Sequence, residues 1–167
     1  VRSSAACARG ALRRGVPAAV ADAGRGLPFR DGQFDTVTCI DVLHHLDRNW
    51  APLLEELGRV VKAGGRMVLI EPDARNAFVR WTQAPGSPIR VAPWPNEPAI
   101  YPVELIAPLE ERGYAVRVDS LQLDGEQTVR DVFPMWQRVL KVPFVIALDR
   151  LHRGKANKFA IVAEKKT

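Results

Sequence analysis

Acidic and histidine side chains follow two apolar runs of this chain, where a strand would give way to a loop. The first run, Phe34–Ile40, is followed by Asp41, His44 and His45, and the second is followed by Glu71. Histidine titrates near neutral pH and carboxylates accept hydrogen bonds, so these residue types suit acid–base chemistry. Ligands of open α/β sheets bind at the carboxyl ends of strands. The spacing therefore predicts a ligand site formed by the two loops.

The adjacent histidines His44 and His45 allow two interpretations. Either could act as a general base, and either could instead pack or hydrogen-bond within the loop. Neighbouring histidines are a poor pair for one metal ion, and no metal site is predicted. Cys39 is a weak candidate for a nucleophile, because no motif places a base beside it. Asp35 and Glu71 are expected to organise the loops rather than to act as acid and base.

Periodicity and turn formers predict the elements that must position these residues. A helix with one apolar stripe and a Gly-Gly turn separate the two strands, which gives a strand–helix–strand unit. A strand with apolar residues on both faces is expected to be covered on both sides. In chain order the predicted elements are helix Ser3–Arg14, buried strand Val16–Ala21 ending at Asp22, strand Phe34–Ile40, helix Leu53–Lys62 stopped by Gly64-Gly65, and strand Arg66–Ile70.

The second half of the chain predicts a long segment and then a closing group of elements. Residues 73–100 are rich in proline and carry two tryptophans, and a segment of this length in a compact domain is usually functional, so a substrate-side lid is expected. The elements predicted after it are helix Val103–Glu111 ended by Gly113, strand Ala115–Leu121, a helical stretch within Val129–Arg153, and strand Lys158–Ala163.

The order of short motifs resembles one enzyme family over residues 16 to 72. The motifs are Asp22-Ala23, Leu27-Pro28-Phe29, Phe34-Asp35, Leu43-His44-His45-Leu46, Arg59-Val60-Val61-Lys62-Ala63-Gly64-Gly65 and Glu71-Pro72. In this order and spacing they resemble the class I S-adenosylmethionine (SAM)-dependent methyltransferases. The resemblance implies an α/β fold: a Rossmann-like, mostly parallel sheet with helices on both faces and an antiparallel C-terminal strand pair.

The resemblance also implies roles for individual residues. Asp22 matches the acid that accepts a hydrogen bond from the adenine amino group of SAM, and the backbone N–H of Ala23 could serve a ring nitrogen. Cys39, Ile40 and Asp41 match the strand end that lines the methionine half of the cofactor. The family often carries a histidine at the position of His45, where it commonly organises the loop.

One family motif has no counterpart in the sequence. The Gly-rich loop that contacts the methionine portion would precede Asp22, and Gly24-Arg25-Gly26 follows the wrong strand and opens no helix. We therefore expect an N-terminally truncated form of the fold that by itself binds SAM weakly or not at all. The alternative function is that of a non-catalytic interaction module, with an exposed sheet edge that would favour dimers.

The composition of the chain indicates one domain and argues against a nucleic-acid-binding, membrane-spanning or disulfide-rich protein. The 167 residues, 47% of them hydrophobic, fit a single domain spanning 1–167. The net charge of +5 is spread along the chain without a long basic run, so no nucleic-acid partner is predicted and a small-molecule methyl acceptor is expected instead. Apolar runs are too short to span a bilayer, and two cysteines make no disulfide framework. A cytoplasmic setting without membrane partners is therefore expected.

Overall fold

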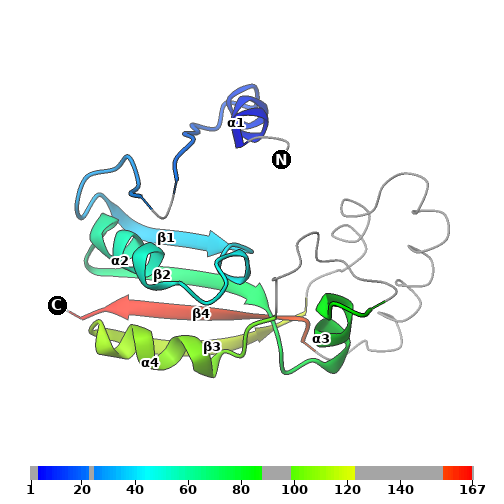
Figure 1. The fold of residues 1–167 in the computed structure, drawn as a ribbon. Helices are drawn as coiled ribbons and strands as arrows, with labels where there is room; N and C mark the ends of the chain where they lie inside the picture. The colour runs from blue at the N-terminus through cyan, green and yellow to red at the C-terminus, as the bar shows by residue number, and fades with distance from the viewer. Residues whose placement is uncertain (1–3, 23–24, 88–98, 123–155, 167) are drawn as a thin grey trace.

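A four-stranded mixed sheet forms the centre of the molecule (Figure 1). The computed structural model describes residues 4–22, 25–87, 99–122 and 156–166. The strands stand in the order β1-β2-β4-β3, and β1 pairs with β2 in parallel while β4 runs antiparallel to both β2 and β3. The α/β class and the antiparallel C-terminal pair are thus confirmed, and among the described strands one pair is parallel. The strands are β1 Phe34–Ile40, β2 Val61–Pro72, β3 Tyr114–Leu121 and β4 Lys158–Lys165.

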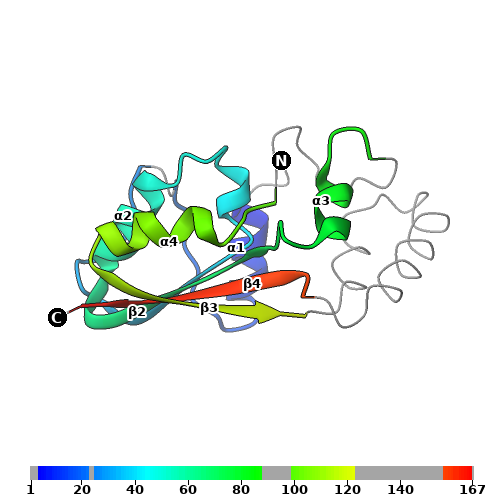
Figure 2. The same cartoon turned by 90° about the horizontal axis from the view of Figure 1, so that it is seen from below.

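Two helices, α2 and α4, cover the same face of the sheet (Figure 2). Helix α2, Ala51–Val60, buries Leu53, Leu54 and Leu57 on one side, as the predicted apolar stripe requires. Helix α4, Val103–Glu111, buries Leu105 and Leu109 and tolerates Pro108 in its interior. Three further elements complete the described part of the chain: α1 Ser4–Leu12, the 3-10 turn η1 Leu43–His45, and α3 Ala77–Gln83.

The hydrophobic core lies between this helical layer and the sheet. Alternation along the central strands turns Met67 and Leu69 of β2 and Phe159 and Ile161 of β4 inward, and all four are fully buried. Each such side chain contributes about 1.5–3 kcal/mol relative to an exposed one. The core therefore fixes the register of β2 and β4, whose ends carry the polar residues described below.

The predicted strand Val16–Ala21 is wrong. The structure has no strand there, and Val16 and Val20 are more than half exposed. A strand needs a neighbour for its N–H and C=O groups, and none of the described strands pairs with this segment, in which Pro17 also lacks a donor. Ala23 and the predicted helical stretch Val129–Arg153 lie outside the described residues.

Strand β1 is less enclosed than its composition suggested. It stands at one edge of the described sheet, and Ile40 is 52% exposed, so the expectation of cover on both faces is not met. The helix–strand boundary also differs: α2 ends at Val60, and Gly64 and Gly65 lie inside β2 instead of stopping the helix. The ladder shifts register between Phe34 and Thr36 to accommodate them.

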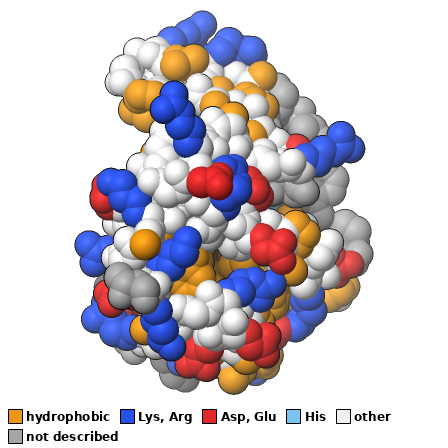
Figure 3. Space-filling view, turned by 90° about the vertical axis from the view of Figure 1, so that its left-hand side faces the viewer, with side chains coloured by type: hydrophobic (Ala, Val, Ile, Leu, Met, Phe, Trp, Pro, Cys, Tyr) orange, Lys and Arg blue, Asp and Glu red, His pale blue; other side chains and the backbone are white. Residues whose placement is uncertain are grey.

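Two features of the structure relate to the predictions that the protein has no nucleic-acid partner and no membrane partner. On the face near the amino ends of β1 and β2, basic and acidic side chains are intermixed (Figure 3). None of the helices within the described ranges is long and apolar enough to cross a membrane. The segment 73–100 contains α3 and the described residues up to Ser87, and residues 88–98 lie outside the description.

Gly65 gives a direct test of the β1–β2 register. A Cβ there would lie 2.8 Å from the backbone oxygen of Asp35 and 3.0 Å from that of Lys62, and backbone atoms cannot swing away. We expect Gly65→Ala to lower the free energy of unfolding by roughly 1–3 kcal/mol in urea titrations. Gly86→Ala is the matched control, because its Cβ would meet nothing within 4 Å. Equal stability of the two variants would contradict the register.

Candidate functional site

Glu71 is a fully buried carboxylate at the carboxyl end of β2. Its Oε1 accepts hydrogen bonds from the backbone N–H of Val42 at 2.9 Å and of Leu43 at 2.7 Å. Its Oε2 lies 2.7 Å from Nδ1 of His44. We call these four residues the Glu71 cluster. A buried carboxylate costs several kcal/mol unless it is hydrogen-bonded, and three donors offset that cost here.

The pleat of β2 explains why an acid is buried at this point. Met67, Leu69 and Glu71 alternate onto the core face, so the acid points into the protein just beyond the last apolar layer. Since β1 runs parallel to β2, its following loop begins beside that carboxylate. The backbone donors of the loop therefore reach Glu71, and the carboxylate fixes the path of the chain after β1.

Two further contacts fasten the same loop. The indole N–H of Trp50 donates to the carbonyl of Leu43 at 2.9 Å, and both side chains are buried. Arg48 forms an ion pair with Glu104 at the start of α4. Arg48 has a positive φ of 65°, which a non-glycine residue adopts only where its surroundings hold it. The loop is thus anchored to β2, α2 and α4.

Asp41 is the first residue after β1 and adopts a left-handed conformation with φ 54°. Its backbone N–H donates to the carbonyl of Ile70 at 2.9 Å, and its Oδ2 pairs with Nζ of Lys158 from β4. The side chain is partly exposed, but Oδ1 is itself buried and none of the described residues donates to it. An unpaired buried acceptor is costly, so Oδ1 is a candidate acceptor for a donor group of a ligand.

Asp41, His44 and Glu71 could each offer one ligand atom to a metal ion, and these atoms lie within 4.8 Å of one another. Most of their capacity is already used. Glu71 accepts three hydrogen bonds, Nδ1 of His44 faces that carboxylate, and the ammonium of Lys158 neutralises Asp41. We therefore treat the group as a hydrogen-bonded cluster, and the absence of a metal remains a prediction.

The remaining predicted residues are distributed differently. Asp22 lies in the segment before the loop at 25–33, is 63% exposed and pairs with Arg25 at 3.3 Å. His45 is exposed, with its ring 4.0 Å from that of His44, and His44 rather than His45 contacts Glu71. The structure thus brings Cys39, Asp41 and His44 together at one strand end.

Cys39 is buried and does not resemble a nucleophile. Burial, reinforced by the negative charges of Glu71 and Asp41, raises the pKa of its thiol to about 12. Only a thiolate attacks efficiently, and at neutral pH this thiol stays protonated. Cys39 therefore lines the strand end as a small apolar group.

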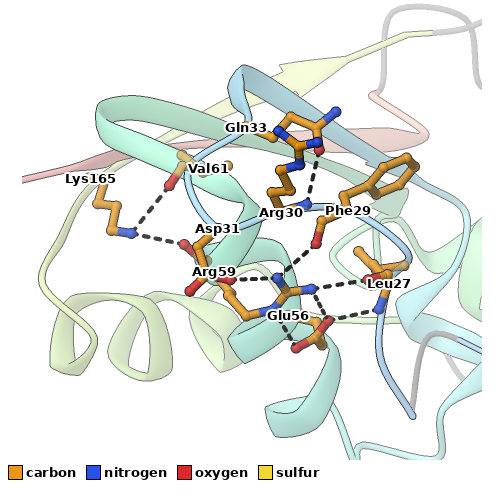
Figure 4. A network of polar contacts seen from close by, with 10 residues as sticks. Leu27, Phe29, Arg30, Asp31, Gln33, Glu56, Arg59, Val61 and Lys165 are labelled. Atoms are coloured by element: carbon orange, nitrogen blue, oxygen red, sulfur yellow. Dashed lines mark hydrogen bonds and ion pairs between the residues drawn. The ribbon is translucent and has the colours of Figure 1, made fainter.

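A second polar network holds the loop that carries Leu27-Pro28-Phe29 (Figure 4). The guanidinium of Arg59 donates to the carbonyls of Leu27 at 3.0 Å and Phe29 at 2.8 Å, and it pairs with Asp31 at 2.7 Å. Glu56, one turn earlier on α2, receives the backbone N–H of Leu27 at 2.7 Å. Side chains of α2 thus position the loop that follows Asp22.

Sequence reasoning missed several of these contacts. Lys158 is 117 residues from Asp41, and no local pattern joins them. Trp50 precedes α2, and Glu56 and Arg59 lie on it. The apolar stripe of this helix predicts its buried face but not the contacts of its polar side chains. One signal was available for Glu71: an acid continuing the inward alternation of a buried strand is expected to have buried partners.

Glu71→Gln tests the cluster. The amide oxygen can still accept from Val42 and Leu43, but the charge of the carboxylate is lost and the amide N–H faces Nδ1 of His44, which can accept it only if the ring changes tautomer. We expect the free energy of unfolding to fall by about 2–4 kcal/mol in urea titrations. Glu55→Gln, on the exposed side of α2, is the control and should change little. A similar effect for both variants would refute the anchoring role of Glu71.

The Cys39 thiol should be inert in the folded protein. In a Cys7→Ser background, Ellman's reagent should modify Cys39 at least about 100-fold more slowly than in urea, because the folded thiol carries almost no thiolate at pH 8. Absorbance at the thionitrobenzoate maximum follows the reaction. Rapid modification without denaturant would show that the thiol is accessible and activated.

The Arg59 network predicts an acid-dependent component of stability. Hydrogen bonds from Arg59 and Leu27 lower the pKa of Glu56 from 4.5 to about 2. Because the folded pKa is the lower one, the contribution is present above pH 4.5 and is lost as the pH falls toward 2. We expect the stability difference between wild type and Glu56→Gln to shrink over this window in thermal unfolding. A difference that does not change with pH would contradict the network.

Comparisons with known proteins agree with this geometry. Residues 2–69 match the family model of a methyltransferase domain. An uncharacterized protein of Methanocaldococcus jannaschii, MJ0638, is 41% identical over 44 residues, which are 26% of this chain and 19% of that protein. The matched segment is therefore about a fifth of the length of this curated relative.

Solved structures share the fold over most of the chain. A SAM-dependent methyltransferase from Thermotoga maritima superposes with a TM-score of 0.64 at 18% identity, covering 95% of this chain and 69% of that one. A SAM-dependent methyltransferase from Archaeoglobus fulgidus gives 0.56 at 21% identity, covering 90% and 68%. The cyclase SpnF gives 0.57 at 19% identity, covering 98% and 62%.

The family match and the shared fold lead to one assignment. Strand β1, the loop after it and the Gly-Gly segment in β2 fall within the matched residues 2–69, whereas β3 and β4 lie beyond them. Residues 2–69 are similar to a methyltransferase domain, and the described fold is the Rossmann-like fold of these SAM-dependent methyltransferases; the cofactor that this similarity implies is S-adenosylmethionine.

Proposed function

We propose that the protein transfers a methyl group from SAM to a small-molecule acceptor at the carboxyl end of β1. The observation that carries the proposal is Asp41, whose left-handed turn and unpaired buried Oδ1 stand next to a loop fixed by Glu71. Left-handed non-glycine residues and unsatisfied buried acceptors gather at functional sites. The fold alone does not decide the reaction, since a cyclase shares it.

The residues present fit the chemical groups of SAM. Its amino-acid end carries an ammonium, and Oδ1 of Asp41 is a buried acceptor without a donor from the described residues. Its adenine carries an amino group, for which the exposed carboxylate of Asp22 is the proposed acceptor. Ala23, the next residue in the sequence, is the proposed partner of a ring nitrogen. The backbone at Cys39 and Ile40 would line the methionine portion.

The protein's own contribution to such a reaction is positional. A sulfonium-bound methyl group is already activated, so a rigid site that holds the acceptor in line supplies most of what the reaction needs. The anchored loop after β1 provides that rigidity through Glu71, Trp50 and Arg48. A small organic acceptor is proposed because the basic residues are spread along the sequence without a long run that would mark a nucleic-acid surface.

A specific observation also favours the alternative function, an interaction module. Strand β1 is an edge strand within the described sheet, and Ile40 is half exposed beside that edge. Unpaired edges recruit other strands, including those of a second copy. Analytical ultracentrifugation discriminates the two: an interaction module of this kind is a concentration-dependent dimer that does not bind SAM.

Asp22→Ala should weaken SAM binding by at least about tenfold, because a hydrogen bond to a charged acceptor contributes roughly 1.5–3 kcal/mol. Equilibrium dialysis against radiolabelled SAM measures the change. Asp35→Ala is the matched control, since that acid is also exposed but sits at the amino end of β1 and pairs with Lys62. Equal affinity of Asp22→Ala and wild type would remove the adenine role from Asp22.

A further inference from the structure

We infer that His44 is the proton acceptor of the site, preset by Glu71 so that Nε2 faces the methyl acceptor with a free lone pair. The inference rests on the proposed methyl transfer and adds to it a base, a positioning residue and a class of acceptor. His44 would touch the substrate, while Glu71 would act only through His44. Three observations carry it: the hydrogen-bond pattern, the fixed ring and the surrounding charges.

The hydrogen-bond pattern determines the tautomer. Glu71 receives two backbone N–H groups on Oε1, and its Oε2 is 2.7 Å from Nδ1 of His44. A carboxylate has no proton to donate, so Nδ1 carries the hydrogen of this bond. In the neutral ring the other nitrogen, Nε2, is then the acceptor. Nε2 points away from Glu71, because the two nitrogens lie on different edges of the imidazole.

The ring is held in place and is not fully enclosed. His44 keeps 9% of its surface exposed, and within the described part of the chain its one hydrogen bond is the one at Nδ1. Its backbone belongs to η1, which Glu71 and Trp50 both fasten through Leu43. A base that is already oriented needs little rearrangement when a substrate arrives.

The charges around the ring suit a group that gains a proton. Glu71 contacts it directly, and the carboxylate of Asp41 has an oxygen within 4.8 Å of a ring nitrogen. Lys158 opposes them, since its ammonium pairs with Asp41, and the ring of His45 lies 4.0 Å away. The ring therefore lies close to two carboxylates and one ammonium group.

The arrangement selects acceptors that lose a proton: a hydroxyl or a thiol as it attacks, or an ammonium group that is deprotonated before its nitrogen attacks. SAM supplies a methyl group whose bond to sulfur breaks with the electron pair staying on sulfur. As the acceptor's heteroatom forms its bond to that carbon, its proton passes to Nε2, and the imidazolium later returns it to water. Acceptors without such a proton, such as a carboxylate or a tertiary amine, would not need His44.

The tautomer is measurable without cofactor or acceptor. Nitrogen-15 NMR of the 167-residue chain labelled at histidine should show one neutral ring with Nδ1 protonated and Nε2 unprotonated, and His44→Gln should remove that signal. Glu71→Gln should release the ring toward the Nε2–H form that free histidine prefers. If the His44 ring of the wild-type protein has Nε2 protonated, the inference is overturned, even if the Glu71 variant does not fold.

Reactivity tests the access that a base requires and a purely structural histidine lacks. Diethyl pyrocarbonate acylates only an unprotonated, reachable imidazole nitrogen, and peptide mass spectrometry locates the product. We expect His44 to react within about tenfold of exposed His45. A His44 that stays unmodified overturns the inference. Neither readout involves SAM, so a failure of SAM binding would count against the proposed function alone.

Discussion

Burial of the Glu71 carboxylate is the constraint on which the rest of the site depends. A charge enclosed by the core is tolerated only while its donors stay in place, so the loop after β1 cannot move without exposing an unpaired acid. The strand alternation that places Met67 and Leu69 in the core also places Glu71 there. Hydrophobic packing thereby determines the position of polar groups at the strand ends.

The elements with strong local signals could be predicted from the sequence. Strand Phe34–Ile40 and helix Val103–Glu111 have the bounds expected, since periodicity and stop signals lie within a few residues. Val16–Ala21 failed because a strand depends on a neighbour, which no local pattern reveals. For the same reason the sequence did not reveal the contact of Lys158 with Asp41, and it left His44 and His45 as equal candidates for a general base.

The site combines segments that only the fold brings together. Residues after β1, the end of β2 and the start of β4 meet at one edge, where parallel and antiparallel strands converge (Figure 1). Arg59 of α2 holds the loop after Asp22 through hydrogen bonds to the carbonyls of Leu27 and Phe29. Proteins with this fold catalyse different reactions, so the chemistry depends on these particular side chains and not on the sheet.

The central claim is that SAM binds at the carboxyl end of β1. Proton–nitrogen correlation spectra of the 167-residue chain, recorded with SAM up to about 5 mM, detect even binding near −4 kcal/mol. We predict saturable shifts at the backbone amides of Cys39, Asp41 and Leu43, with Gly65 at the far end of β2 unchanged. No shift at the carboxyl end of β1, or shifts confined to the amino ends of the strands, would contradict the account.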